Sequence, residues 1–195
     1  MQPQTYVFFG IVGSGKGTQI KLLIDLIKEK NNTDTVYAYP GAEYRKLIES
    51  ESYTGSLIKD SITKGELQPD FLTNAIFANI LSCNLTNKKN LIADGYPRTV
   101  AQAEEFEKMM HFFKRENIKI IYIEVSKEEA MKRNLLRGRI DDTEEGIAKR
   151  FDEYVKNVVP AMEYFKVKDG YTIFKINGEQ TVEKVHEDIK KVLGF

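Results

Sequence analysis

Short apolar runs alternate along the chain with longer stretches of helical periodicity, and this alternation constrains the fold more than any other feature of the sequence. The runs are rich in β-branched and aromatic residues and lie at positions 6–9, 36–39, 91–93, 120–125 and 171–176. Strands separated by helices need right-handed crossovers, which produce a parallel sheet that is covered on both faces. The pattern therefore predicts an α/β fold with five parallel strands.

The alternation is interrupted at residues 40–85, which carry only helical signals. Gly65 follows an apolar helix face and is expected to cap it, and Asp70 is expected to be the N-cap of a helix that runs to Leu85. The length of 195 residues suits one domain. We therefore expect a single domain, residues 1–195, with a helical insertion at 40–70.

Charge and cysteine content exclude several classes of protein. Lys+Arg and Asp+Glu both number 29, so the chain lacks the broad positive field of a non-specific nucleic-acid binder. The single cysteine, Cys83, excludes an internal disulfide and a cysteine-based zinc cluster, and we expect it in the core. No apolar run approaches the roughly 18 residues that span a bilayer, and the N-terminal residues lack the basic charge of a signal peptide. These features predict a cytoplasmic protein that binds neither nucleic acid nor membrane.

The segment GIVGSGKGT, residues 10–18, joins the first expected strand to the first expected helix. Glycines let the backbone curl so that successive N–H groups point at phosphate oxygens, and the helix N-terminus adds its dipole. Lys16 supplies a charge for the β- and γ-phosphates, and Thr18 supplies a hydroxyl one position later than usual because Gly17 intervenes. A plain glycine-rich turn is the alternative, but the position between strand and helix favours a phosphate-binding loop.

A second candidate segment follows the third expected strand. Asp94 lies at its carboxyl end, where open α/β sheets bind their ligands, and a carboxylate there can order water around Mg²⁺. Arg98 follows the stiff pair Tyr96-Pro97 and can fork onto a phosphate. Residues of these types are also common in solvated turns, so a plain turn is the alternative.

Four arginines surround a short polar loop between two expected helices: Arg133, Arg137, Arg139 and Arg150. Guanidinium groups that converge on one cleft repel one another unless phosphates lie among them, and phosphoryl-transfer sites need such charge. A solvated basic helix is the alternative. Asp142 and Glu145 have the spacing of a capping box for the second helix, and Pro160 is expected to start or kink a further helix.

Together, the phosphate loop, residues 91–102 and residues 137–142 resemble the adenylate kinase family, and the similarity covers essentially the whole chain. The chain is similar to the short-lid type, which lacks the zinc-type cysteines of a longer lid. The resemblance implies a P-loop kinase with residues 40–70 as the NMP-binding insertion and residues 134–143 as a short lid loop. It also implies reversible phosphoryl transfer from ATP to AMP, which gives two ADP, by a monomer that uses Mg²⁺.

The resemblance assigns a role to each matching residue. The implied ATP-binding residues are Gly13, Ser14, Gly15, Lys16, Gly17, Thr18, Arg133, Arg137 and Gln180. The implied AMP-binding residues are Pro40, Gly41, Arg45, Glu66, Leu67, Gln68, Gly95, Arg98, Gln102, Arg139 and Arg150. Thr18 and Asp94 would hold Mg²⁺ through water. The implied catalytic residues are Lys16, Arg98, Arg133, Arg137, Arg139 and Arg150.

One departure from the family pattern concerns the acceptor base. The family has Thr-Gly-Asp where this chain has Pro40-Gly41-Ala42, and proline offers neither a hydroxyl nor an N–H to adenine. Gln102 still favours AMP, because the related pyrimidine-nucleotide kinases carry Asn at that position. Two alternatives stay open: a UMP/CMP or other nucleoside monophosphate kinase, and a non-catalytic P-loop switch, which would not need the arginines around a second phosphate site.

Overall fold

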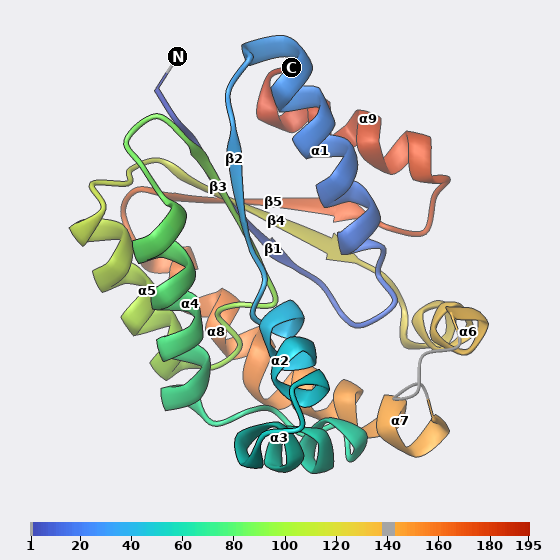
Figure 1. Ribbon diagram of the computed structural model, residues 1–195. Helices are drawn as coiled ribbons and strands as arrows, with labels where there is room; N and C mark the ends of the chain where they lie inside the picture. Colours follow the sequence, from blue (N-terminus) through green and yellow to red (C-terminus); the bar gives the residue numbers. More distant parts are fainter. Residues whose placement is uncertain (1, 138–142) are drawn as a thin grey trace.

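The computed structural model describes residues 2–137 and 143–195. Its five strands form one parallel sheet in the order β2-β3-β1-β4-β5, which confirms the expected fold class (Figure 1). The strands are β1 (Thr5–Phe9), β2 (Thr35–Ala38), β3 (Asn90–Asp94), β4 (Ile118–Glu124) and β5 (Tyr171–Asn177). All residues of β1 and β3 are buried, as expected for central strands that helices cover on both faces.

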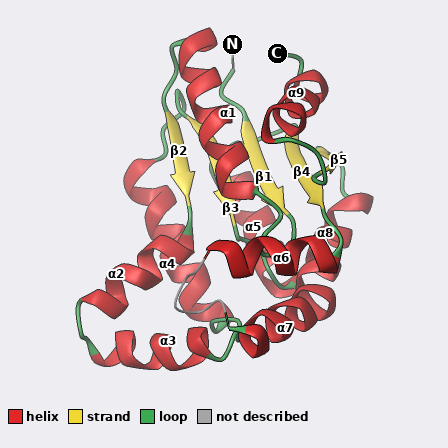
Figure 2. Ribbon diagram, turned by 90° about the vertical axis from the view of Figure 1, so that its right-hand side faces the viewer, coloured by secondary structure: helices red, strands yellow, loops and turns green. Residues whose placement is uncertain are grey.

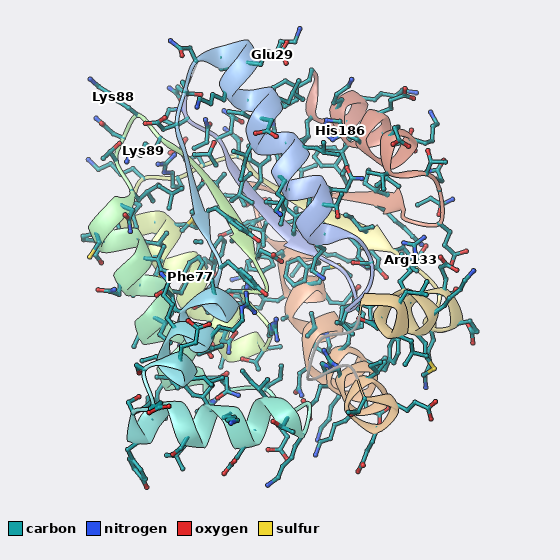
Figure 3. The ribbon with its side chains drawn as sticks, turned by 45° about the vertical axis from the view of Figure 1, so that its right-hand side comes forward. Glu29, Phe77, Lys88, Lys89, Arg133 and His186 are labelled. Atoms are coloured by element: carbon teal, nitrogen blue, oxygen red, sulfur yellow. The ribbon has the colours of Figure 1, made fainter. Side chains whose placement is uncertain are left out.

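Helices cover the two faces of this sheet unequally. One apolar cluster joins the sheet to α1 and α9, and a larger cluster joins the opposite face to α4, α5 and α8 (Figure 1). Phe77 of α4, labelled in Figure 3, is fully buried in the larger cluster, where its ring stacks on Tyr96 with a centroid distance of 4.0 Å. The helices are α1 (Lys16–Asn31), α2 (Pro40–Glu49), α3 (Tyr53–Thr63), α4 (Asp70–Asn84), α5 (Val100–Phe112), α6 (Lys127–Arg137), α7 (Glu144–Glu153), α8 (Val159–Tyr164) and α9 (Val182–Leu193). No helix in the described ranges has the length and apolarity needed to cross a membrane.

The connections that follow β1 and β3 run to opposite faces of the sheet. The segment after β1 leads to α1 on one face of the sheet, whereas the segment after β3 leads to α5 on the other face. Because β1 and β3 are neighbours, their divergent connections open a crevice at their carboxyl ends, which is where sheets of this kind bind ligands. Figure 2 shows that the strands point toward α2, α3, α6 and α7, so these helices border the crevice.

Helices α2 and α3 and the start of α4 form the expected all-helical insertion. Two of its predicted caps are displaced by one residue. Lys64 is the C-cap of α3, and Gly65 follows it with φ 73° and donates to Ile62 O. Pro69 is at the N-cap position of α4, so Asp70 is the first helical residue. The Asp70 carboxylate is not a cap because it accepts hydrogen bonds from α5 and from the residue that precedes α5.

The segment expected as a lid loop, residues 134–143, begins inside a helix. Residues 134–137 form the last turn of α6, and residues 138–142 lie outside the described part of the chain. Thr143 is the N-cap of α7, because its hydroxyl accepts from the Gly146 N–H at 3.1 Å, so the predicted capping box at Asp142 is wrong. Pro160 is in the first turn of α8, as expected, and a π-helical segment, Tyr154–Val158, precedes it.

Cys83 is exposed, so its predicted place in the core is wrong. The buried side chains of α4 recur every fourth residue, at Thr73, Phe77 and Leu81. Cys83 lies two positions beyond Leu81, a rotation of about 200° around the helix axis, and therefore faces away from the core.

Candidate active site

A cavity of about 1,210 Å³ lies at the carboxyl ends of the strands, bordered by the phosphate loop, the helical insertion and helices α6 and α7. The resemblance implied 21 site residues. Nineteen of them line this cavity: Gly13, Ser14, Gly15, Lys16, Gly17, Thr18, Pro40, Gly41, Arg45, Glu66, Leu67, Gln68, Asp94, Gly95, Arg98, Gln102, Arg133, Arg150 and Gln180. The other two are Arg137 and Arg139. Arg139 and the side chain of Arg137 lie outside the part that the structure describes.

The phosphate loop has a backbone that only glycine adopts at two positions. Gly13 and Gly15 have φ of 87° and 90°. A Cβ on Gly13 would lie 2.6 Å from both the Ala130 carbonyl and the Asn134 amide nitrogen, so α6 packs directly against the loop. Asn134 is fully buried and donates to the Val12 carbonyl at 3.0 Å, which fixes the loop from outside.

Two polar side chains of the loop are placed for an anionic ligand. Lys16 donates to the carbonyls of Gly10 at 2.6 Å and Ile11 at 3.2 Å. The Lys16 side chain therefore reaches back to the start of the phosphate loop. The Ser14 hydroxyl is buried and has no hydrogen-bond partner among the described residues. A buried hydroxyl without a partner is costly, and a phosphate oxygen at the loop would satisfy it.

Asp94 closes the other side of the crevice, at the end of β3. Asp94 is 6 % exposed, and its Oδ2 accepts a hydrogen bond from the Tyr37 hydroxyl at 2.7 Å. Burial, followed by the neighbouring Asp94 charge, holds the pKa of Tyr37 well above its usual range. The phenol therefore keeps its proton and acts as the donor in this bond.

Thr18 and Asp94 suit a hard cation that is held partly by phosphates. Both line the same cavity, and a hydroxyl and a carboxylate are the oxygen ligands that Mg²⁺ takes directly or through water. No group of three or more His, Cys, Asp or Glu side chains forms a metal cage within residues 2–137 and 143–195. This arrangement fits Mg²⁺ that arrives with a nucleotide, because such sites supply one or two protein oxygens and leave the rest to phosphate and water.

Gln102 is oriented by two partners that leave no ambiguity about its amide. Its Nε2 donates to the Asp70 carboxylate at 2.7 Å, and its Oε1 accepts from the Arg98 backbone N–H at 2.8 Å. A carboxylate can only accept and a backbone N–H can only donate, so oxygen and nitrogen cannot be exchanged. Each amide atom keeps one further hydrogen-bonding position. Gln102 is 1 % exposed yet lines the cavity, so a ligand would approach a fixed donor and acceptor pair.

Arg98 and Arg45 approach the cavity from different elements. The Arg98 side chain folds back over its own turn, where Nε donates to the Gly95 carbonyl at 2.9 Å. Arg45 lies on α2 with its guanidinium carbon 5.1 Å from the centre of the Tyr39 ring, and Nη1 donates weakly to the Tyr39 hydroxyl at 3.4 Å. Both arginines therefore rest on neutral partners and keep their positive charge available.

The segment that departs from the family pattern begins α2. Pro40 is at N1, where a missing N–H costs no helical hydrogen bond. One turn later, Tyr44 is buried, and its hydroxyl hydrogen-bonds to Thr73 of α4 at 2.6 Å. Burial raises the pKa of Tyr44. The phenol is therefore engaged with α4 and is not a substitute for the missing threonine hydroxyl.

Residues 66–68 connect α3 to α4 along the cavity wall. Glu66 forms an exposed ion pair with Lys149 of α7 at 3.2 Å, which is worth little by itself. The Gln68 amide and the Ser61 hydroxyl hydrogen-bond to each other, with Nε2 2.8 Å from Oγ. Leu67 lies between Glu66 and Gln68 in the sequence. The side chains of Glu66 and Gln68 are thus paired within the protein, in keeping with the implied backbone contacts.

Arginines of α6 and α7 also line the cavity. Arg133, labelled in Figure 3, projects from α6, and its Nε is paired with Glu129 at 2.7 Å. Arg150 of α7 donates from Nε to the Gly146 carbonyl at 3.1 Å, and its Cγ lies 3.4 Å from the position of a Cβ on Gly65. Arg150 therefore lies beside the insertion, whereas Arg133 lies farther along the cavity wall on α6.

Gln180 follows β5 at the far end of the cavity. Its Nε2 donates to the Asn177 carbonyl at 3.0 Å and to Asp188 of α9 at 2.8 Å. This pairing holds the turn between β5 and α9 in place. The side chain is thereby engaged, which fits the implied contact through the main chain.

Three residues that shape this site were not predicted from the sequence: Tyr37, Asp70 and Asn134. Each forms a hydrogen bond to a residue that is distant in the sequence. These bonds join β2 to β3, α4 to α5, and α6 to the phosphate loop. Only Asn134 carried a usable signal, because a polar side chain on the apolar face of an expected helix calls for a buried partner.

Comparison with known proteins agrees with this geometry. The family model described as adenylate kinase matches residues 8–170. An adenylate kinase of Prochlorococcus marinus (strain MIT 9301) is 35 % identical over 185 residues, which cover 95 % of this chain and 96 % of the relative. An adenylate kinase of Parabacteroides distasonis is 34 % identical with 96 % of each chain covered, and one of Thermosipho africanus is 30 % identical with 96 % and 98 % covered. The chain belongs to the adenylate kinase family of phosphotransferases.

Proposed function

We propose that this enzyme transfers a phosphoryl group from ATP to AMP inside the cavity at the carboxyl ends of the strands, with ATP on the phosphate loop and AMP against the helical insertion. The observation that carries the proposal is that one continuous cavity has cationic side chains on both sides. Lys16 lies at the phosphate loop, and Arg45, Arg98 and Arg150 lie toward the insertion. A switch that binds one nucleotide has no use for the second group.

On the donor side, the backbone of Gly13 to Thr18 and the dipole of α1 would hold the ATP phosphates. Arg133 would approach them from α6. Gln180 would contact the adenine through its main chain. We assign Arg137 and Arg139 to the ATP side and the acceptor side on the resemblance alone.

On the acceptor side, Arg45 and Arg98 would bind the α-phosphate of AMP. Arg150 would contact both this phosphate and the phosphoryl group that is transferred. The Gly95 turn, residues 66–68 and Pro40-Gly41 would surround the base. Phosphoryl transfer needs little covalent help from the protein once donor and acceptor are held in line. The AMP phosphate is already anionic at neutral pH, so no general base is required.

Mg²⁺ is part of the proposal, with Thr18 and Asp94 as the residues that would hold it through water. When bound, it would supply positive charge that neutralises the charge developing on the phosphates during transfer. Lys16 and the arginines would spread the remaining charge over groups that are already in place, which saves reorganisation at the moment of reaction.

The fixed amide of Gln102 supports the choice of base. Adenine offers an N6 amino donor next to an N1 acceptor, which matches one acceptor and one donor on the amide. Uracil and guanine present a carbonyl and an N–H in the same places and would leave the remaining donor and acceptor positions of the amide unpaired. Cytosine has the same pattern as adenine, so CMP would be rejected by size and contact area, which is a weaker criterion.

A panel of AMP, dAMP, CMP, UMP, GMP and dTMP with ATP and Mg²⁺ tests this proposal by kcat/KM. We expect AMP to be best and CMP to be the nearest competitor among other bases. The missing hydroxyl at Pro40 corresponds to one hydrogen bond of about 0.5–1.5 kcal/mol, so Pro40→Thr should raise the AMP preference roughly two- to tenfold. If UMP is the best acceptor, the enzyme is a pyrimidine kinase.

We further propose a cytoplasmic monomer. The elements around the cavity have to move for nucleotides to enter and leave, and burial in an interface would oppose that motion. Sedimentation of the purified protein at micromolar concentration tests the monomer, and fractionation of cells tests the location.

A further inference from the structure

The Asp94 carboxylate has a hydrogen-bond partner that the sequence analysis did not assign. Asp94 is buried at the end of β3, and the Tyr37 hydroxyl of β2 donates to its Oδ2 at 2.7 Å. No other side chain in residues 2–137 and 143–195 donates a hydrogen bond to this carboxylate. Among the described residues, the Tyr37 phenol is therefore the group that orients the Asp94 carboxylate.

The phenol is itself held in place by its neighbours. The β2–β3 register pairs Tyr37 with Ile92 and Ala38 with Ala93, so the Tyr37 side chain starts two residues before Asp94. Its ring stacks on Tyr39, with centroids 5.7 Å apart and planes inclined by 19°. Tyr39 in turn carries the guanidinium of Arg45 at 5.1 Å from its ring centre. The stack restricts the Tyr37 ring and so fixes the direction of its hydroxyl.

We infer that Tyr37 is a positioning residue for phosphoryl transfer: its hydroxyl holds one oxygen of Asp94 and turns the other toward the water shell of the divalent cation. The inference rests on the proposed role of Asp94 toward Mg²⁺. A carboxylate that is fixed by a second group presents its free oxygen in one direction, whereas an unheld carboxylate rotates about χ1 and χ2 and binds less tightly. Partners that orient direct metal ligands commonly contribute 10- to 100-fold to metal affinity, and we expect the lower end of that range here because Asp94 would hold the cation through water.

The test uses Tyr37→Phe, which removes the hydroxyl and keeps the ring that stacks on Tyr39. We expect the affinity of Mn²⁺ for the enzyme–ADP complex, measured by electron paramagnetic resonance, to fall about tenfold. The Mg²⁺ concentration for half-maximal rate should rise by a similar factor, and the KM for AMP at saturating Mg²⁺ should stay within twofold. Tyr53→Phe is the matched control, because Tyr53 lies 80 % exposed on α3.

Two results would overturn the inference. One is an unchanged Mn²⁺ affinity in Tyr37→Phe together with a lower melting temperature, which would make the hydroxyl a structural group of the β2–β3 edge. The other is an equal loss of AMP and Mn²⁺ affinity, which would mean a general disturbance of the cavity. Asp94→Asn separates this inference from the proposed function. If Asp94→Asn weakens Mn²⁺ binding and Tyr37→Phe does not, the role of Asp94 stands and that of Tyr37 fails; if neither variant weakens it, both fail.

Discussion

Two cationic side chains at this site, Lys16 and Arg98, donate to backbone carbonyls. Lys16 donates to two carbonyls of the loop that it follows, and Arg98 donates to the carbonyl of Gly95. These main-chain carbonyls orient the two cationic side chains and carry no negative charge of their own. This arrangement makes the contribution of each charge measurable by a single substitution.

Lys16→Met should lower kcat by at least about a hundredfold, because a positioned charge on the transferring phosphoryl group is lost. Methionine keeps most of the length of the side chain, so the melting temperature should change little. Lys28→Met, in the exposed last turn of the same helix, is the control and should retain full activity. Turnover of the Lys16 variant within threefold of the parent would remove this residue from the mechanism.

Arg98→Ala should affect the acceptor more than ATP. A charge-assisted contact to phosphate contributes about 1.5–3 kcal/mol, so the KM for AMP should rise roughly tenfold or more. The backbone N–H that orients Gln102 is kept in this variant, so the base preference in the acceptor panel should not change. A rise confined to the KM for ATP would reverse our assignment of the two subsites.

The sequence predicted which residues line the cavity better than it predicted the residues that hold them in place. Lys16, Asp94 and Arg98 belong to short segments in which a residue type and its neighbours already indicate a phosphate or metal ligand. The bond from Tyr37 to Asp94 joins residues 57 positions apart, and it exists only because β2 pairs with β3 in one register. Nothing in the local sequence of either strand fixes that register.

At the scale of elements, the sequence predicted which segments are strands and which are helices, because the two have different periodicities. It did not predict the residues at which the helices begin. Asp70 and Asp142 both have the side chain of an N-cap, yet the caps fall on Pro69 and Thr143. For α4, the Asp70 carboxylate makes tertiary bonds to Thr99 and Gln102 instead. A local capping preference of about 1 kcal/mol is easily outweighed by several such bonds to a different helix.

The junction between α3 and residues 66–68, which we propose as part of the acceptor side, depends on Gly65. Its φ of 73° disfavours any side chain, and a Cβ there would lie 2.6 Å from the Gly146 carbonyl of α7. Gly65→Ala should therefore lose about 1–2 kcal/mol of unfolding free energy from backbone strain and about 1–3 kcal/mol more from the clash. The KM for AMP should also rise, because residues 66–68 would be pushed from their place.

Gly170→Ala is the matched control for this substitution. Gly170 has φ 81°, and a Cβ there would have no atom within 4 Å, so the variant measures backbone strain alone. Urea unfolding of both variants separates the two contributions. If both variants lose the same stability and the KM for AMP is unchanged, α7 shifts to make room for the added Cβ. The contact between Gly65 and α7 then does not fix the position of residues 66–68.

At the scale of the whole molecule, the proposal requires two nucleotide subsites in one fold. A cavity of about 1,210 Å³ exceeds the range of roughly 300–1,000 Å³ that is usual for one small ligand. ADP can occupy either subsite, since it is the product on both sides of the reaction. Ligand linkage therefore offers a measurement that counts subsites without measuring turnover.

The unfolding free energy should rise with ADP according to the number of molecules that the folded state binds. Each occupied site adds RT ln(1 + [L]/Kd), which above Kd is about 1.4 kcal/mol for each tenfold increase in ligand. With Mg²⁺ present and ADP above both dissociation constants, we expect a slope of about 2.8 kcal/mol per decade, that is, two sites at about 1.4 each. AMP alone should give about 1.4, because it fills only the acceptor subsite. Arg98→Ala weakens that subsite, so its ADP slope should stay near 1.4 over the first decade and reach 2.8 only at higher concentration. A one-nucleotide switch would hold the slope at 1.4 throughout and would not respond to AMP, and that result would exclude a kinase with two subsites.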